Sequence, residues 1–432
     1  MDSIIQRIFD VAVIGAGPAG IAAALAAAES GASVALIDDN PAPGGQIWRG
    51  GRNASHHLEA RRWLERLSKS RVTLIGGTRV FYAHAGALEA ESDHSLWQLL
   101  YGKLILATGA RELFLPFPGW TMPNVFGAGG LQALVKSGLP VKGKHVVIAG
   151  TGPLLLAVAA YLCERGADVL CICEQAPFAS LRAFTLGMAS YPGKLVEAAQ
   201  LRFRSRRAPY LTSAWPVAAL GQDRLQAVRI SDNGRLREIE CEYLACGFHL
   251  VPNLELARAL DCRVVDGFVG VNELQETSQP GVYCAGEPTG IGGVELSIVE
   301  GQIAGHAAAG RVSSAKRLLT TRARSRRAVK AMKKAFALRP ELAALATPDT
   351  LLCRCEDVSF EAAQKHATWR AAKLHSRCGM GPCQGRVCGA AAEFLFGWTM
   401  DSSRPPIFPA RCSSLAAIST PASPAQGHGG SQ

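Results

Sequence analysis

The stretch FDVAVIGAGPAGIAAALAAAESGASVALIDDN, residues 9–40, decides the fold. An apolar run, a glycine turn, an alanine-rich segment and a second apolar run predict the strand–turn–helix–strand order of a dinucleotide-binding unit. Gly15, Gly17 and Gly20 have the G-x-G-x-x-G spacing, which permits a tight turn, close approach of the backbone to a pyrophosphate and close helix–strand packing. Asp38 follows the second strand, where its carboxylate can accept hydrogen bonds from ribose hydroxyls. The sequence therefore predicts a Rossmann-type unit at the N-terminal end.

Three later segments are predicted to complete this first nucleotide site. PAPGGQIWRG (41–50) is a glycine turn, and LILATGARELFLPFPG (104–119) is a strand ending in Ala-Thr-Gly, where the chain leaves the first domain. GVYCAGEPTGIGGVELSIVEGQIAGHAAAG (281–310) reads as a strand, an acid and a glycine-rich helix start whose dipole can face a flavin ring. We expect Glu287 to bond the ribityl hydroxyls of that flavin. The candidate residues are Gly15, Gly17, Pro18, Ala19, Gly20, Asp38, Asp39, Gly45, Gln46, Thr108, Gly109, Gly286 and Glu287.

A second nucleotide unit opens at HVVIAGTGPLLLAVAAYLCERGADVLCICEQ (145–175). The third glycine position holds Leu155, which we expect to force helix and strand slightly apart. Glu174 ends the second strand and would disfavour a 2′-phosphate, so a nicotinamide nucleotide here would be NAD rather than NADP. Another adenine nucleotide, or a purely structural repeat, remains an alternative. The candidate residues are Gly150, Gly152, Pro153 and Glu174.

The order of these motifs predicts the domain organisation. EYLACGFHLVPN (242–253) resembles a second Ala-x-Gly exit, which returns the chain to the first domain. We therefore expect an α/β protein with two Rossmann-type domains, one inserted in the other. The first would comprise residues 1–112 and 250–312, and the inserted one residues 113–249.

Cysteines concentrate in CRCEDVSFEAAQKHATWRAAKLHSRCGMGPCQGRVCG (353–389), which holds five of the chain's 13. Their spacing is C-x-C, then 22 residues, then C-x4-C-x4-C. Thiols this dense favour soft-metal ligation over disulfides, and an iron–sulfur cluster needs four thiolates. A zinc site and a set of reduced core cysteines are the alternatives. We expect four glycines to let backbone N–H groups approach inorganic sulfide. They are Gly379, Gly381, Gly385 and Gly389.

Composition and charge narrow the class of protein. The chain of 432 residues is 48% hydrophobic with 45 glycines, which is typical of a globular α/β protein. No apolar run is long enough to span a membrane, and a strand begins within the first ten residues, which leaves no room for a signal peptide. These features predict a cytoplasmic protein that meets the inner membrane, if at all, through partners. No C-x-x-C lies near either nucleotide motif, which argues against a dithiol–disulfide reductase.

The net charge of +11 is uneven, and residues 311–334 carry ten Lys or Arg and no acid. We interpret residues 313–348 as a basic helical linker. A solvated helix or a docking surface for an acidic subunit is favoured over a nucleic-acid arm, because aromatic residues are absent there. The Pro-, Ser- and Gly-rich tail, residues 401–432, is expected to have no fold of its own, with RPPIFP (404–409) as an extended arm on a partner and the last dozen residues disordered.

Together these motifs resemble the α subunits of heteromeric, dye-linked amine and amino-acid dehydrogenases. This family includes D-hydroxyproline dehydrogenase, the opine oxidases and hydrogen cyanide synthase. The resemblance covers residues 8–400 and is most specific in GAGPAG, IDDNPAPGGQIWRG, ILATGARE, GTGPLLLAVAAYL, CAGEPTGIGGVELSIVEG and CRCEDV…RCGMGPCQGRVC. It implies a pyridine-nucleotide-disulfide-reductase-like fold with FAD in the first domain. Leu155 follows the family's own pattern, which argues against ordinary NAD use.

The cysteine-rich segment resembles the 2Fe–2S module of bacterioferritin-associated ferredoxin, which implies a small helical domain over residues 349–400. Cys353, Cys355 and Cys383 match cluster ligands. The fourth ligand is Cys388, as in glycerol-3-phosphate dehydrogenases, or Cys378, as in the ferredoxin. A four-cysteine cluster therefore leaves one spare thiol.

The resemblance also implies partners and a function. A sarcosine-oxidase-like flavoprotein β subunit would oxidise the C–N bond of a small amino acid, and a small ferredoxin-like γ subunit could join it. This chain would pass the electrons on to a quinone or dye, and no residue of it would be an acid–base catalyst for the substrate. One alternative is a self-sufficient NADH-dependent ferredoxin or rubredoxin reductase. Another is a non-enzymatic iron–sulfur scaffold or sensor that uses the basic helix on nucleic acid.

Overall fold

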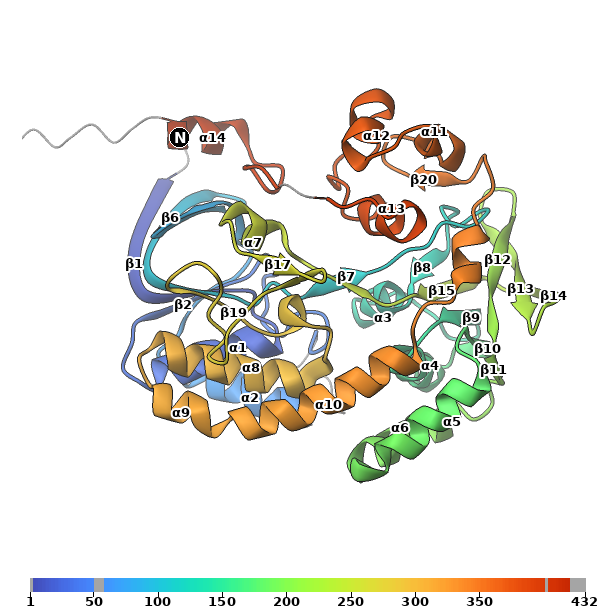
Figure 1. Cartoon of the computed structure of the whole chain (residues 1–432), viewed down its shortest axis with the longest axis horizontal. Coiled ribbons are helices and arrows are strands. Elements are labelled where there is room, and N and C mark those ends of the chain that lie inside the picture. Colours follow the sequence, from blue (N-terminus) through green and yellow to red (C-terminus); the bar gives the residue numbers. More distant parts are fainter. Residues whose placement is uncertain (1–2, 50–57, 401–402, 420–432) are drawn as a thin grey trace, which may run out of the picture.

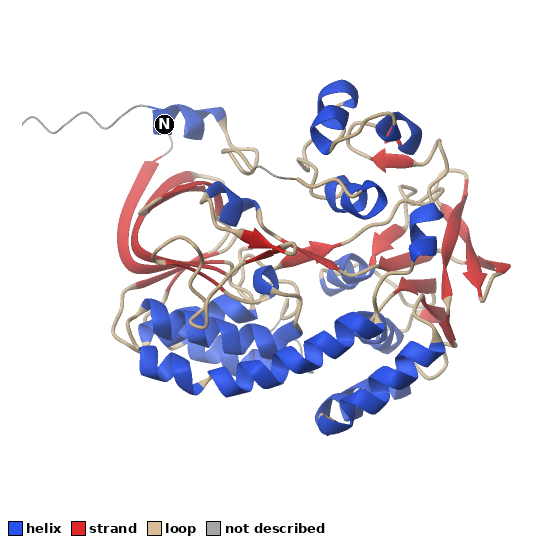
Figure 2. Cartoon of the chain, viewed as in Figure 1, coloured by secondary structure: helices blue, strands red, loops and turns tan. Residues whose placement is uncertain are grey.

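The computed structural model describes residues 3–49, 58–400 and 403–419. Two doubly wound units and a small, mainly helical C-terminal domain lie side by side (Figures 1 and 2). The expected α/β class with two Rossmann-type domains is confirmed. The expected disorder of the last dozen residues concerns a segment outside the described residues.

The first domain is built on a seven-stranded sheet in the order β3-β2-β1-β6-β5-β4, with β19 added beside β6. Strands β1, β2, β3, β6 and β19 pair in parallel, so their carboxyl ends meet at one edge, where the glycine turn lies. β4 and β5 are antiparallel. The strands are β1 Ser3–Ile14, β2 Val34–Ile37, β3 Thr73–Ile75, β4 Arg79–His84, β5 Ala87–Glu91, β6 Ser95–Leu106 and β19 Val282–Cys284.

Small residues let two helices of this domain pack closely. Helix α1 (Pro18–Ala28) crosses α8 (Gly293–Ala308), and α2 (Leu58–Ser68) packs beside α1. A Cβ on Gly301 would lie 2.2 Å from the Ala19 carbonyl oxygen, and one on Gly305 would lie 2.2 Å from that of Ala23. This contact joins the first nucleotide motif to the last segment of the domain, about 270 residues later in the chain.

The inserted domain has a five-stranded sheet in the order β11-β10-β9-β15-β8, and an antiparallel sheet of β12, β13 and β14 packs beside it. Two short antiparallel connecting strands, β7 (Ala110–Glu112) and β16 (Leu250–Pro252), carry the chain between the domains. The strands are β8 Val125–Gly127, β9 His145–Gly150, β10 Asp168–Glu174, β11 Tyr210–Thr212, β12 Ala214–Gly221, β13 Leu225–Asp232, β14 Arg235–Glu240 and β15 Tyr243–Gly247. The helices are α3 Ala128–Lys136, α4 Pro153–Glu164, α5 Phe178–Gly187, η1 Met188–Ser190 and α6 Pro192–Arg204.

The remaining elements return to the first domain and then form the C-terminal part. After the second crossing come α7 Glu255–Ala259, β17 Val264–Val265, β18 Phe268–Val269 and η2 Glu287–Thr289. The linker contains α9 Val312–Arg317, α10 Leu319–Ala335 and η3 Pro340–Ala344. The cysteine-rich segment forms β20 Leu351–Cys353, β21 Val358–Ser359, α11 Phe360–Gln364, α12 Trp369–Ser376 and α13 Cys388–Phe396.

The sequence predicted that the basic helix α10 would be solvated or would dock on a partner. The structure shows instead that part of this helix packs on the chain's own domains. It runs from α8 to the inserted domain, where it packs beside α5 (Figure 1). Arg326 forms a two-nitrogen contact with the buried carboxylate of Glu300, and Arg322 is buried and donates to the Gln275 side chain. Two of its charges therefore anchor the linker to the first domain.

The first part of the tail also differs from the expectation. Residues 403–419 pack on the first domain, with Ile407 buried, and end in helix α14 (Cys412–Ser419). The Ile407 amide donates to the Phe81 carbonyl, and Ser414 donates to Glu91. The apolar side chains of RPPIFP explain the difference, because they cover this chain's own sheet rather than a partner's surface.

Candidate functional site

The first glycine turn is packed so tightly that larger residues do not fit. Gly15 has φ +101°, and a Cβ there would lie 2.2 Å from the Ala107 carbonyl oxygen. A Cβ on Gly20 would lie 1.7 Å from the Gly15 carbonyl oxygen, so helix α1 starts directly against the turn. Around Gly17, by contrast, a Cβ would meet only Gly45, at 4.0 Å. The turn therefore leaves at Gly17 the small cradle that a pyrophosphate needs.

The predicted carboxylates lie beside this turn. Asp38 is buried and accepts hydrogen bonds from the amides of Ala16 and Asn40, which fixes the carboxylate against the turn. Asp39 is half exposed and lies 3.7 Å from Arg79, and burial raises its pKa. Asp38 thus both shapes the turn and occupies the position expected of a ribose-binding acid.

Two predicted loops close on the same turn. The Gly44 amide donates to the Ala16 carbonyl at 2.7 Å, which places Gly45 over Gly17, while Gln46 is exposed. Gly50, the last residue of that predicted motif, lies outside the described residues. At the Ala-Thr-Gly exit, Thr108 exchanges two hydrogen bonds with Asn253 on the returning strand, both at 2.8 Å.

The last predicted segment reaches this site through Gly286 and Glu287. Gly286 has φ +80°, and a Cβ there would lie 2.8 Å from the Cβ of Ala19 at the start of α1. The Glu287 carboxylate accepts hydrogen bonds from the amides of Gly292 and Gly293, where α8 begins. Burial raises the pKa of Glu287 to about 7. The structure therefore gathers all the predicted segments of the first site around one glycine turn.

The second unit has the same order of strand, glycine turn, helix and strand, but its turn differs at the second glycine: φ is −76° at Gly17 and +92° at Gly152. Gly150 and Gly152 are buried, and Pro153 is exposed at the start of α4. The sequence predicted that Leu155 would force the helix and the strand apart. Instead the leucine is buried and packs against Gly247 on the neighbouring strand, where the absence of a side chain leaves room for it. The leucine belongs to a well-packed core rather than to a loosened one.

Glu174 points inward rather than toward solvent. It is 0% exposed and accepts hydrogen bonds from the Thr151 hydroxyl and from the amides of Gly152 and Ala176. The Tyr210 hydroxyl lies 3.4 Å from the same carboxylate. Its hydrogen-bonding capacity is thus used within the protein.

The linker after α10 covers this second glycine turn. Phe336 is 5% exposed, its ring lies 4.0 Å from the Cβ position of Gly152, and its carbonyl oxygen lies 3.5 Å from the Thr151 hydroxyl oxygen. The Gln175 side chain donates to the Ala337 carbonyl and accepts from the Arg339 amide. Residues 336–339, which we call the linker plug, therefore lie where an incoming dinucleotide would approach.

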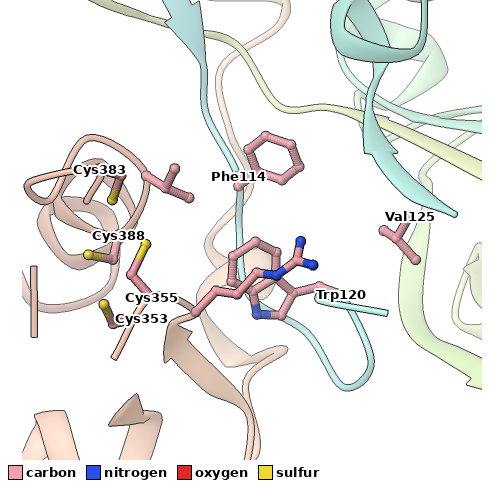
Figure 3. A pocket seen from close by; sticks show the side chains of 9 residues that line it. Phe114, Trp120, Val125, Cys353, Cys355, Cys383 and Cys388 are labelled. Atoms are coloured by element: carbon pink, nitrogen blue, oxygen red, sulfur yellow. The ribbon is translucent and has the colours of Figure 1, made fainter. Parts of the chain in front are cut away.

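The clustered cysteines surround one cavity of about 170 Å³. Figure 3 shows the sulfur atoms of four cysteines close to one another on one side of it, with Phe114 and Trp120 of the inserted domain on the other. The Trp120 indole donates to the Leu351 carbonyl at 2.6 Å and so fixes that wall. The four cysteines are Cys353, Cys355, Cys383 and Cys388.

Cys378 belongs to the same cluster without lining the cavity. Its sulfur, with those of Cys353 and Cys388, lies in a group whose members are all within 4.8 Å of one another. Hydrogen bonds from neighbouring thiols lower the pKa of Cys353 and that of Cys383. Burial raises the pKa of Cys355, and hydrogen bonds with neighbouring thiols raise that of Cys388, so the fit to a four-thiolate metal group rests on the shared cavity.

The four glycines of this segment are explained mainly by packing. Cβ atoms on Gly379 and Gly385 would lie 2.5 Å and 2.8 Å from the Trp369 ring, and one on Gly389 would lie 2.2 Å from the Met400 sulfur. A Cβ on Gly381 would meet the Cβ of Cys355 at 2.4 Å. In support of the expected amide–sulfur contacts, the Gly379 amide donates to the Cys353 sulfur at 3.4 Å.

Sequence reasoning missed three charged residues that link the two sites. Arg111, two residues after the Ala-Thr-Gly motif, pairs with Glu255 at 2.9 Å and donates to the Arg386 carbonyl between Cys383 and Cys388. Glu255 also lies 3.5 Å from Arg386. Arg111 and Arg386 could have been suspected from the sequence, because they are close along the chain to the Ala-Thr-Gly motif and to the clustered cysteines. Glu255 could not, because only the fold brings it to these arginines.

Within the described residues, no helix is both long and apolar enough to cross a membrane.

Residues 9–312 match the pyridine nucleotide-disulphide oxidoreductase family. This family's domain implies FAD, and the glycine turn with its cradle at Gly17 and its acid at Asp38 fits that cofactor.

The relatives and the fold point the same way. An opine oxidase subunit from Rhizobium meliloti is 34% identical over 96% of this chain and 100% of its own length. The HcnB subunit of hydrogen cyanide synthase from Pseudomonas protegens is 31% identical over 87% of this chain and 89% of its own. L-proline dehydrogenase from P. horikoshii has the same fold, with a TM-score of 0.68 at 19% identity over 96% of this chain and 81% of its own. The chain is therefore an oxidoreductase of the pyridine nucleotide-disulphide oxidoreductase family and belongs, within it, to the group of flavin-dependent oxidoreductases that contains this opine oxidase polypeptide and HcnB.

Proposed function

We propose that this chain is the FAD- and 2Fe–2S-containing α subunit of a heteromeric amino-acid or imino-acid dehydrogenase of the D-hydroxyproline dehydrogenase type. It passes electrons from a flavin-containing β subunit to a quinone or dye. The observation that carries the proposal is the set of four cysteines that line one cavity, joined by partly buried charges to the loop of the first nucleotide site.

In this proposal the first domain holds FAD and the second does not hold NAD. The Gly15–Gly20 turn takes the pyrophosphate, Asp38 the ribose, and Glu287 the ribityl chain. The positive end of α8 lies beside Glu287 and favours negative charge on a bound flavin. When bound, FAD accepts electrons in pairs and releases them singly, and a 2Fe–2S cluster carries single electrons.

The ligand set proposed for the cluster is Cys353, Cys355, Cys383 and Cys388. These four thiols line the cavity, whereas Cys378 does not, although its sulfur lies within 4.8 Å of those of Cys353 and Cys388; we infer that Cys378 is the spare thiol. The protein's contribution is to hold the four sulfurs together and to place the apolar rings of Phe114 and Trp120 against the same cavity, while Cys355 stays exposed to solvent.

The substrate and partners follow from the relatives, which are named as subunits of opine oxidase and of hydrogen cyanide synthase. We infer a small amino acid as substrate, oxidised on a sarcosine-oxidase-like flavoprotein β subunit, with a small ferredoxin-like γ subunit as a further partner. A relative named as the alpha subunit of sarcosine oxidase, 29% identical over 57% of this chain, agrees with C–N bond chemistry. Contact with the inner membrane would be made through such partners.

The rival function is an NADH-dependent ferredoxin or rubredoxin reductase with both nucleotide sites in use. The linker plug disfavours it, because NADH would have to displace the Phe336 ring from the second glycine turn.

Cofactor analysis of the anaerobically purified chain tests the proposal. We expect FAD absorbance, iron and acid-labile sulfide in equal amounts, and a low-temperature paramagnetic signal after reduction with dithionite. Cys383→Ser should lose most of the iron, whereas Cys412→Ser, which changes an exposed cysteine on α14, should keep it. An iron-free wild-type protein would sink the proposal.

A further inference from the structure

A chain of polar contacts connects the first nucleotide site to the cysteine cavity. Thr108 of the Ala-Thr-Gly motif bonds Asn253, and the Asn253 side chain accepts a hydrogen bond from Arg111 at 2.7 Å. Arg111 pairs with Glu255 at 2.9 Å and donates through Nε to the Arg386 carbonyl at 2.9 Å. The chain therefore ends in the loop that carries two of the proposed cluster ligands.

Arg386 lies at the end of this chain, in the loop between Cys383 and Cys388. Its Nη1 donates to the Cys383 carbonyl at 3.2 Å, so its guanidinium lies against the backbone of a proposed ligand. Glu255 lies 3.5 Å from its Nε, and the ring of Phe408 lies 4.1 Å beneath the guanidinium. The side chain is thus held from several directions and cannot swing away from the cysteine loop.

These charges are sheltered enough to act on a neighbouring redox group. The side chains of Arg386 and Glu255 are 15% and 17% exposed. Charges in such surroundings interact more strongly than solvated ones, although a cleft of about 760 Å³ that both residues line admits some screening. Reduction of a 2Fe–2S cluster adds one electron and therefore one negative charge, which a nearby cation stabilises.

We propose that Arg386 is a positioning residue that raises the reduction potential of the cluster held by Cys353, Cys355, Cys383 and Cys388, and that Glu255 limits this effect. The inference rests on the proposed function, since it requires a cluster at this site. Its consequence is that the Arg111–Glu255–Arg386 network fixes the cysteine loop next to the proposed FAD-binding loop and also changes the driving force for electron transfer between the two groups.

The test is a redox titration of the intact, anaerobically purified chain with dithionite. The paramagnetic signal of the reduced cluster is measured at each potential and gives the midpoint potential. Arg386→Gln should shift the midpoint potential negative, because a cation is lost. Arg386→Lys should keep most of the wild-type value, and Glu255→Gln should shift it positive, because an anion is lost. Lys365→Gln removes a 67% exposed cation from the same domain and should leave the potential unchanged.

The signs separate charge tuning from a purely structural role. If the two residues had a purely structural role, Arg386→Gln and Glu255→Gln would shift the midpoint potential in the same direction, because both break the same network. That result would overturn the inference. An unchanged potential in both variants would overturn it as well. If Arg386→Gln fails to retain iron, the sign of the Glu255→Gln shift decides alone. Absence of any cluster in the wild-type chain would instead refute the proposed function, so the two failures can be told apart.

Discussion

In the first Rossmann-type unit the glycine turn faces another glycine, Gly45, whereas in the second it faces the ring of Phe336. The two units share strand–turn–helix geometry, and each has a carboxylate at the end of its second strand. Asp38 remains beside a turn with room for a phosphate, while Glu174 is buried under the linker plug. A repeated fold therefore does not imply a repeated cofactor, since the surroundings of the turn decide which unit can bind a nucleotide.

The linker also connects the two units. Residues 319–335 cross from the first domain to the second, and the plug that follows packs on the second glycine turn. The inserted domain additionally supplies Phe114 and Trp120 to the cysteine cavity. The second unit thus contacts both the linker and the cysteine-rich domain.

Replacing Gly20, the third glycine of the first motif, should abolish FAD binding and strongly destabilise the first unit. Gly20→Leu copies the residue that the second unit carries at Leu155, but here its Cβ would lie 1.7 Å from the Gly15 carbonyl oxygen. We expect loss of FAD and destabilisation of several kcal/mol, beyond the 1–3 kcal/mol or so that is usual for overpacking. Absorbance of bound flavin and thermal unfolding measure both effects.

Gly187→Ala is the control, because a Cβ there meets nothing within 4 Å and its φ is helical. A Gly20→Leu protein that keeps its flavin would show that the tight turn is not needed.

Deleting the Phe336 ring of the linker plug should lower the stability of the second unit. Phe336→Ala deletes a buried ring that packs against Phe184 and Gly152, and we expect a loss of about 3–5 kcal/mol in the free energy of unfolding. Urea denaturation measures it. Phe178→Ala, at a ring that is 66% exposed, should stay within about 0.5 kcal/mol of wild type. Equal effects of the two substitutions would mean that the plug is not a packed element.

Glu287, whose carboxylate accepts hydrogen bonds at the start of α8, should make the free energy of unfolding of the first unit depend on pH. Burial raises the pKa of Glu287 to about 7 from 4.5, so the folded state holds this proton more tightly than the unfolded one. Its contribution to the free energy of unfolding therefore falls as pH rises from about 4.5 to about 7, by at most about 3 kcal/mol at roughly 1.4 kcal/mol per pKa unit.

Glu287→Gln should remove that slope from urea denaturation curves recorded between pH 5 and pH 7. The exposed Glu295→Gln on the same helix should leave it in place. A wild-type slope of opposite sign would contradict the assignment.

The sequence was most informative where chemistry depends on neighbours along the chain. Gly15, Gly17, Gly20 and Asp38 lie in one continuous motif, so their joint position could be predicted from spacing. The linker plug could not, because Phe336 meets Thr151 across 185 residues and a buried phenylalanine has no distinctive pattern.

The same limit applied to the links between domains. Arg111 and Arg386 are separated by 275 residues, and only the fold brings them together. The first part of the tail, residues 403–419, was misjudged because its composition resembles disorder, whereas Ile407 and Phe408 supply the few apolar contacts that hold it to the first sheet.

The central claim is that one nucleotide unit works as a cofactor site and the other is closed by the chain's own linker. Anaerobic mixing of the purified FAD-loaded chain with NADH, followed by flavin absorbance on the millisecond scale, tests it most directly. Our account predicts an unchanged flavin spectrum under conditions in which dithionite bleaches it fully. Bleaching by NADH within milliseconds, without any partner protein, would contradict it.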